Sequence, residues 1–244
     1  MLVVYWQGQI NVENVDWQLL PDTEMVLSED LELKRGKIWQ KIVDQYPKAY
    51  DGMLLRLGSY SVKEKRLRLN MSCIRFSRVQ TMLQSNIRFE PYGVLGVQAI
   101  ILSPDRRYLL YGERSKDHMH CPQFLGSPGG MLGIEDAKRP FWQACMREII
   151  EEAHIAFRKE KLMIAIIADL YTPVGTVLLL HAIAKEQPDV TKPVPGNDEW
   201  TNQELHWYPV ETLSVLDNSR SLEGLVFAKK EWQQFNNTGK SVIW

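Results

Sequence analysis

Apolar residues recur every three or four positions in three stretches of the chain. This spacing predicts helices over residues 37–46, where Pro47 ends the run, and over residues 141–153 and 222–235. Segment 11–35 is polar and acidic and shows no clear period. We therefore expect a loop with some helix there.

Alternating or continuously apolar runs predict the strands. These runs cover residues 2–6, 53–62, 64–77, 94–103, 108–115, 161–171, 176–186 and 204–213, the last including a short helix. Strands on both sides of the helix 141–153, followed by a C-terminal helix, predict an α/β fold, an α/β/α sandwich with a mixed sheet. Pro91-Tyr92-Gly93 punctuates the chain, so we expect an N-terminal mixed α/β lobe over 1–90 and a second domain over 91–244.

The predicted helix 141–153 has three glutamates at positions i, i+3 and i+4. Glu148, Glu151 and Glu152 should then point the same way and repel one another. A divalent cation such as Mg²⁺ would remove this repulsion, because it takes oxygen ligands. A solvated acidic helix face is the plainer alternative. The glycine-rich turn upstream, with Gly129 and Gly130, favours a metal site.

The run from Gly126 to Ile155 resembles the Nudix box, G-x5-E-x7-R-E-U-x-E-E-x-G-U, with U a bulky aliphatic residue. Its C-terminal half stands as Arg147-Glu148-Ile149-Ile150-Glu151-Glu152-Ala153-His154-Ile155, with His154 in place of the glycine. The first glutamate of the pattern falls on Arg139 instead, and the loop is lengthened. Glu135 or Asp136 is then the candidate for the displaced carboxylate.

The resemblance implies a catalytic set and a metal. Arg147, Glu148, Glu151 and Glu152 would be catalytic. Mg²⁺, or Mn²⁺ in its place, would be held by Glu148, Glu151 and Glu152 with Glu135. Substrate phosphates would contact Gly129, Gly130 and Arg114, which follows the second strand of the predicted hairpin. Glu199 or Glu204 could serve as a remote general base.

The implied reaction is Mg²⁺-dependent hydrolysis of a nucleoside diphosphate linked to another group. The order YDGMLLRLGSY, LRLNMSCIRFS, GVLGVQAIILS and GGML resembles the branch that hydrolyses UDP-sugars to UMP and sugar 1-phosphate. ADP-ribose or another NDP-linked compound is the alternative substrate. A Nudix scaffold that binds a nucleotide or protein partner without hydrolysis is the alternative function, which the substitutions at Arg139 and His154 favour.

Composition narrows the class of protein. A net charge of −1 argues against nucleic-acid or anionic-membrane binding. Three scattered cysteines and no signal-like N-terminus favour a cytoplasmic protein. His118, His120 and Cys121 lack a second Cys/His pair at zinc-finger spacing. We expect them to line the loop before the glycine turn.

Overall fold

A single sheet runs through the protein. The computed structural model describes residues 3–118, 121–155, 157–169, 175–221 and 223–244. Several predicted positions lie outside the described residues. They are residue 2 of the run 2–6, His120, residues 170–171 of the run 161–171, residues 173–174 of the break after it, and Leu222. The sheet has the strand order β1-β9-β10-β5-β3-β4-β2, and β6, β7, β8, β11 and β12 branch from this path.

The strands are β1 (Val4–Asn11), β2 (Val15–Glu24), β3 (Met53–Lys63), β4 (Arg66–Arg75), β5 (Val94–Leu102), β6 (Tyr108–Glu113), β7 (Leu125–Gly126), β8 (Gly129–Met131), β9 (Met163–Asp169), β10 (Gly175–Ile183), β11 (Val194–Pro195) and β12 (Glu204–Pro209). The α-helices are α1 (Glu29–Gln45), α2 (Phe76–Gln84), α3 (Phe141–Ala153) and α4 (Glu223–Thr238). The 3-10 helices are η1 (Val12–Asn14), η2 (Asp136–Lys138), η3 (Lys159–Lys161), η4 (Thr201–Gln203), η5 (Val210–Val215) and η6 (Asn218–Arg220).

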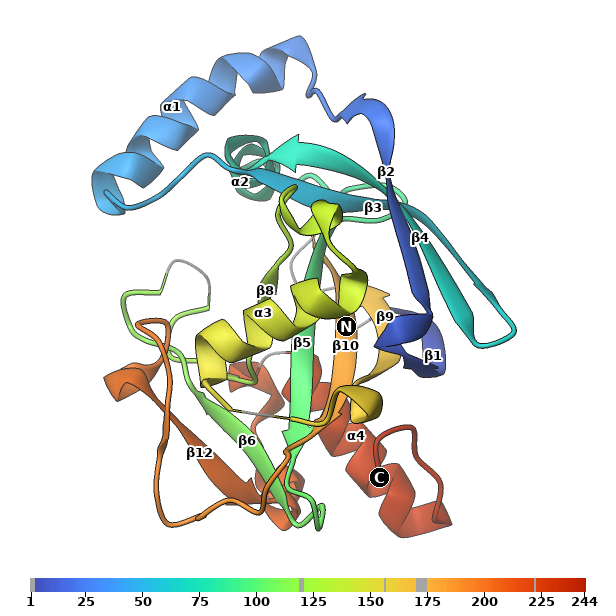
Figure 1. Cartoon of the computed structure of the whole chain (residues 1–244). Helices are drawn as coiled ribbons and strands as arrows, with labels where there is room; N and C mark the ends of the chain where they lie inside the picture. The colour runs from blue at the N-terminus through green and yellow to red at the C-terminus, as the bar shows by residue number, and fades with distance from the viewer. Residues whose placement is uncertain (1–2, 119–120, 156, 170–174, 222) are drawn as a thin grey trace.

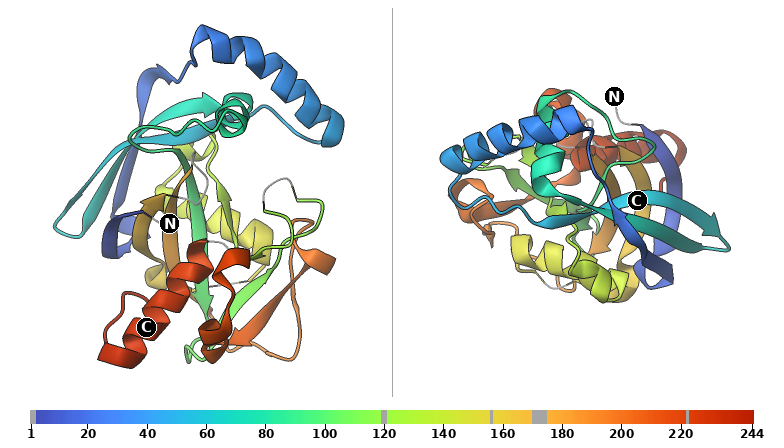
Figure 2. Two further views of the ribbon diagram at one scale, coloured as in Figure 1. Left: turned by 180° about the vertical axis from the view of Figure 1, so that it is seen from behind. Right: turned by 90° about the horizontal axis from the view of Figure 1, so that it is seen from above.

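Two helices cover opposite faces of the central strands. Every residue of β5 and β10 is buried, which explains their unbroken apolar runs. Alternate residues of β5 pack in two separate cores, one with α3 and one with α4. Figure 1 shows α3 in front of β5 and β10, and the view from behind in Figure 2 shows α4 in front of them, on the opposite face of the sheet. Because β10 pairs parallel with β5 but antiparallel with β9, the predicted mixed α/β fold is confirmed.

Strands of the first ninety residues join the same sheet. β1 pairs antiparallel with β9, and β3 meets β5 at Arg56 and Val94. A third core lies under α1 and α2, around Ile74, Val79 and Met82. The boundary at residue 90 stays a prediction, and β1 pairs with a strand from beyond it.

Two predictions along this part of the chain were wrong. Segment 11–35, which we predicted to be a loop with some helix, does contain the start of α1, but it also contains the strand β2. β2 is an edge strand held by backbone pairing with β4, so its side chains need no burial period. The predicted strand 64–77 ends at Arg75, where α2 begins. Ser77 donates its backbone N–H to Asp51 Oδ1 at 2.7 Å, and this bond supports the first turn of α2.

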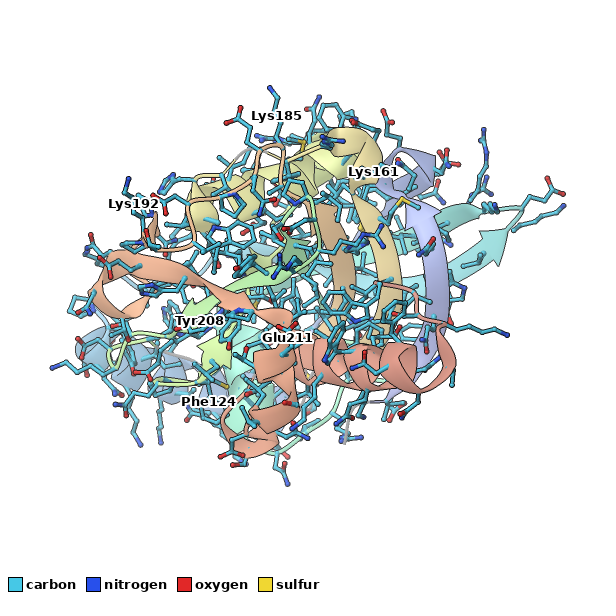
Figure 3. All side chains as sticks on the ribbon, turned by 90° about the horizontal axis from the view of Figure 1, so that it is seen from below. Phe124, Lys161, Lys185, Lys192, Tyr208 and Glu211 are labelled. Atoms are coloured by element: carbon cyan, nitrogen blue, oxygen red, sulfur yellow. The ribbon has the colours of Figure 1, made fainter. Side chains whose placement is uncertain are left out.

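The C-terminal part of the chain packs on the face of the sheet opposite α3. β12 leads directly into η5, which contacts α4. In the view from below, Tyr208 and Glu211 mark this junction (Figure 3). Within the described part of the chain, no helix has the length and apolar character needed to cross a membrane.

Candidate functional site

Helix α3 ends in a conformation that favours glycine. His154, its C-cap, has φ 49° and ψ 26°, and its N–H donates to Ile150 O at 2.9 Å. A left-handed residue at a helix end carries no steric cost when it is glycine. The resembled pattern has glycine at this position because the backbone is left-handed there. His154 adopts the same conformation with some steric strain.

Strand β8 places one glycine against β5 and the next against α3. Gly129 has φ 155°, and a Cβ there would overlap the carbonyl of Val97. A Cβ at Gly130 would overlap the carboxylate of Glu148. These glycines let the helix carboxylates approach the strand as closely as they do.

Two of the three predicted carboxylates face this strand and are buried. Gly129 N–H donates to Glu152 Oε2 at 3.0 Å, and Glu152 is 3% exposed. Burial raises the pKa of Glu148 to about 7, although Arg147 opposes this shift. Burial, together with the negative charge of Glu199, raises the pKa of Glu152 well above its ordinary value. Burial therefore makes ionisation of both carboxyl groups unfavourable.

Arg147 binds acidic groups from two elements. Its Nε and Nη2 donate to Asp136 at 3.0 and 2.7 Å, and Nη1 donates to Glu151 at 2.8 Å. Nη2 also contacts Glu148. Burial would lower the pKa of Arg147, but the hydrogen bonds and charge of Asp136 with the charge of Glu148 raise it. The guanidinium thus joins the loop after β8 to helix α3.

The two candidates for the displaced carboxylate have different environments. The Asp136 side chain is 4% exposed and also accepts from Gly133 N–H at 2.9 Å. The Glu135 side chain is 70% exposed and pairs with Lys138 at 2.6 Å. Asp136 therefore orients Arg147, whereas Glu135 points to solvent and contacts none of the helix glutamates.

A second group of polar side chains meets Glu152 from the other side. Glu199 is hydrogen-bonded to Glu152, lies 3.1 Å from His118 Nε2 and lies 3.5 Å from Arg114 Nη1. Burial opposes ionisation of Glu199, but the His118 hydrogen bond and Arg114 charge lower its pKa. The structure therefore places Arg114, which we predicted as a substrate-binding residue, beside Glu199 together with His118, which we had expected only to line the loop.

The predicted alignment of three glutamates holds for two of them. The Glu151 side chain is 57% exposed and turned to Arg147, while Glu148 and Glu152 face β8. Glu204 pairs at 3.7 Å with His206 on β12. Among the described residues, no three His, Cys, Asp or Glu side chains are arranged to hold a metal ion. Instead, Arg147 donates hydrogen bonds to Glu148 and Glu151, and the N–H of Gly129 donates to Glu152.

The donor chemistry nevertheless fits a hard cation. Glu148 and Glu152 supply carboxylate oxygens whose pKa values are raised by burial, and a cation between them would relieve that cost. To serve as a third ligand of the cation, Glu151 would have to turn away from Arg147.

Two hollows of the surface lie apart from these carboxylates. One, of about 490 Å³, adjoins the start of α3, and the other, of about 390 Å³, lies beside His154 and the segment 184–195. Lys185 and Lys192 of the second hollow lie at the periphery of the molecule (Figure 3). The carboxylate site is recognised by the burial of Glu148 and Glu152.

Neither a family model nor a curated protein matches the sequence. Several solved structures are similar. The MutT protein from Methanosarcina mazei Go1 is 16% identical, with 63% of this chain and 99% of that chain covered and a TM-score of 0.43. A NUDIX hydrolase from Alicyclobacillus acidocaldarius is 12% identical, with 57% and 90% covered and a TM-score of 0.43. A bifunctional NMN adenylyltransferase/ADP ribose pyrophosphatase from Francisella tularensis, complexed with AMP and a Mn ion, is 17% identical, with 64% and 44% covered and a TM-score of 0.38. With identities of 12–17% and TM-scores of 0.38–0.43, these similarities do not establish an activity for this chain.

Proposed function

We propose that this protein is a divalent-metal-dependent Nudix hydrolase that cleaves the diphosphate of a nucleoside diphosphate linked to another group. The observation that carries the proposal is the burial of Glu148 and Glu152 against the glycines of β8. Burying two carboxylates near each other costs free energy. Arg147 beside Glu148 and the charge of Arg114 near Glu152 offset this cost only in part, because the pKa of both carboxyl groups stays raised. A divalent cation would supply the remaining compensation.

Glu148 and Glu152, joined by Glu151, would hold the Mg²⁺ or Mn²⁺. When bound, the cation would neutralise phosphate charge and acidify a water molecule for attack on phosphorus. Glu135 is a weaker candidate ligand than the sequence suggested, because its exposed side chain is paired with Lys138. Asp136 has the positioning role, since it fixes the guanidinium of Arg147.

Arg114 is suited to bind a substrate phosphate. Its side chain is only 12% exposed, and its buried Nε has no hydrogen-bond partner among the described residues. A phosphate oxygen would satisfy this donor, and the planar guanidinium favours such a contact.

Glu199 is the better placed of the two candidate general bases. Its lowered pKa keeps it ionised at neutral pH, and it is hydrogen-bonded to a proposed metal ligand. Glu204 is instead paired with His206 on β12. A base must lie within hydrogen-bond reach of the proton it accepts, and a water bound beside Glu152 would lie within reach of Glu199.

A UDP-sugar is the substrate we favour, with UMP and sugar 1-phosphate as products. The support is the resemblance of four sequence segments to the UDP-sugar branch. ADP-ribose is the alternative, because the diphosphate chemistry of the site is the same for both.

A non-hydrolysing nucleotide binder is the second candidate. Arg147 engages both Glu148 and Glu151, and this arrangement leaves no three described acidic groups ready for a metal. If that pairing persists in solution with Mg²⁺ present, the chain would bind ligand without turnover.

The test is phosphorus NMR of the protein with Mg²⁺ and UDP-glucose, UDP-galactose, ADP-ribose or NADH. We expect a UDP-sugar to yield UMP and sugar phosphate, and turnover to stop with chelator. Glu152→Gln should lower turnover by about a hundredfold or more, whereas Glu160→Gln, an exposed matched control, should not. Ligand binding without conversion of any compound would favour the binder.

A further inference from the structure

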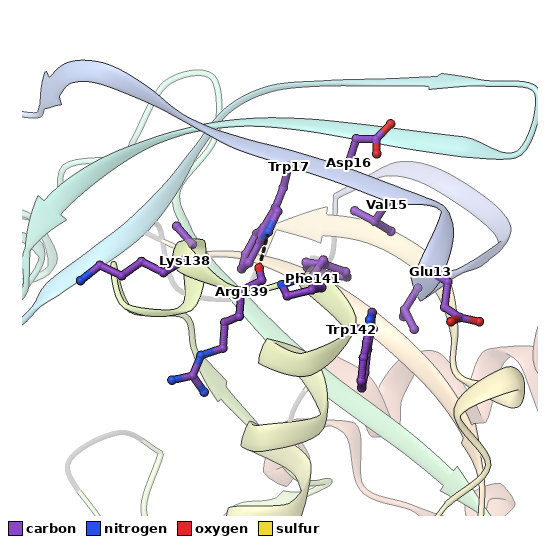
Figure 4. A pocket seen from close by; sticks show the side chains of 11 residues that line it. Glu13, Val15, Asp16, Trp17, Lys138, Arg139, Phe141 and Trp142 are labelled. Carbon is purple, nitrogen blue, oxygen red and sulfur yellow. Dashed lines mark hydrogen bonds between the residues drawn. The ribbon is translucent and has the colours of Figure 1, made fainter.

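A cavity of about 490 Å³ lies between the start of α3 and the segment formed by η1 and β2 (Figure 4). Its walls include Val15 and Trp17 on one side and Arg139, Phe141 and Trp142 on the other. None of its lining residues belongs to the carboxylate site. Small-molecule sites are commonly hollows of about 300–1,000 Å³, so the size suits an organic ligand.

The aromatic walls of this cavity are held in place. Trp17 donates its indole N–H to the carbonyl of Arg139 at 3.0 Å, and its ring meets Phe141 edge-on with centroids 5.1 Å apart. Phe141 is 1% exposed and belongs to the main core. Trp142 packs partly against the same core. Rings already fixed by packing bind a flat partner without a large ordering cost.

The charges around the cavity are asymmetric. Arg139 is exposed and forms no ion pair with any described residue, whereas the neighbouring Lys138 is paired with Glu135. Figure 4 shows Arg139 and Lys138 on one side of the two indoles and Glu13 on the other. An anion would therefore be attracted to the Arg139 end and repelled from the Glu13 end.

We propose that this cavity binds a small planar aromatic molecule bearing one anionic group. The ring lies against the indoles of Trp17 and Trp142, and the anion pairs with the guanidinium of Arg139. This binding needs neither the metal nor the glutamates of α3, so it is independent of hydrolysis.

The experiment uses 2-naphthoate as the probe and its uncharged amide as the matched ligand, both measured by ligand-observed NMR with the full chain. The wild-type protein should bind 2-naphthoate with a millimolar or lower dissociation constant. Arg139→Gln should weaken this binding about fivefold or more, because a charge-assisted contact is lost. The amide should bind both proteins equally. Arg88→Gln, which removes an exposed arginine outside the cavity, should bind 2-naphthoate like the wild type.

Trp142→Ala tests the aromatic wall and should also weaken binding, with circular dichroism confirming that the variant is folded. Arg139 is exposed, so its variant tests the proposal even if the tryptophan variant unfolds. Glu152→Gln should keep full affinity, which separates this site from the proposed hydrolytic one. Wild-type affinity in Arg139→Gln, or no binding to the wild type up to about 10 mM, would overturn the proposal.

Discussion

At the scale of single residues, folding raises the pKa of the Glu148 carboxyl group enough to be measured. Its pKa rises from the ordinary 4.5 to about 7. Between these values the folded state binds more protons than the unfolded state. The contribution of Glu148 to stability is therefore fully present below pH 4.5 and is lost as pH rises to 7. The metal-free protein should lose up to roughly 3 kcal/mol over this window.

Urea denaturation in chelator at pH 5 and pH 8 measures this effect. Glu148→Gln cannot ionise, so its free energy of unfolding should fall less than that of the wild type between the two pH values. A remaining fall is expected from Glu152, whose pKa is also raised. Equal pH dependence in the two proteins would contradict the shift assigned to Glu148.

The adjacent acids Glu135 and Asp136 should respond differently to removal of their charge. Asp136→Asn leaves Arg147 without its bidentate partner, so unfolding free energy should drop by about 2 kcal/mol and turnover should fall. Glu135→Gln removes only an exposed pair with Lys138 and should cost less than about 0.5 kcal/mol. Denaturation curves with turnover assays compare the two, and similar losses would refute the positioning role of Asp136.

The sequence identified many residues of the candidate site but not the contacts between them. Spacing identified the helix carboxylates and the glycine turn, because both depend on residues close together in the chain. The choice of Asp136 over Glu135 depends on which one is buried, and no local pattern encodes that. His118 joins Glu199 across 81 positions, and a lone histidine near a strand end gives no signal of such a contact.

At the scale of elements, the glycines of β8 allow the close approach of this strand to two neighbours, β5 at Gly129 and α3 at Gly130. Gly129→Ala would force a Cβ into backbone atoms of Val97 and Gln98, and we expect a loss of about 2 kcal/mol or more. Gly130→Ala would meet the flexible end of Glu148, so stability should change less while turnover falls. Gly36→Ala in α1 has no atom within 4 Å of the new Cβ and should stabilise by about 0.5–1 kcal/mol.

Thermal denaturation of these three variants ranks the effects, and the order Gly36→Ala, Gly130→Ala, Gly129→Ala from most to least stable is expected. If Gly129→Ala were as stable as the wild type, β8 would not require close approach to β5. Gly36→Ala also reports whether the method resolves a change of this size.

Elements with a clear period were predicted, and those set by neighbours were not. The run 141–153 buries one apolar stripe, so its helical spacing is visible in the sequence. β2 pairs only along one edge and exposes Leu19 and Leu20, so it shows no alternation. α2 begins within a run that reads as strand, and a side chain as distant as Asp51 supports its first turn.

At the scale of the whole molecule, the N-terminal segment completes the sheet of the remainder. β1 covers the edge of β9, and Tyr5 donates its hydroxyl to Asp169 at 2.6 Å. Gln7 donates to the buried Glu231 at 2.8 Å, which links β1 to α4. Without these residues, β9 would become an edge strand and the Oε1 atom of the buried Glu231 would lose its hydrogen bond from Gln7, while Oε2 would keep Ser241 and Val242.

The fragment 91–244 tests whether residue 90 divides two independent domains. Because β9 and Glu231 would lose β1, we expect the isolated fragment to lack cooperative unfolding and dispersed amide signals in NMR. Adding the separate fragment 1–90 should restore both, since the two pieces together supply every strand of the sheet. A cooperative transition of 91–244 alone, at the stability of the full chain, would instead make the N-terminal part an accessory lobe with little energetic coupling to the proposed hydrolytic site.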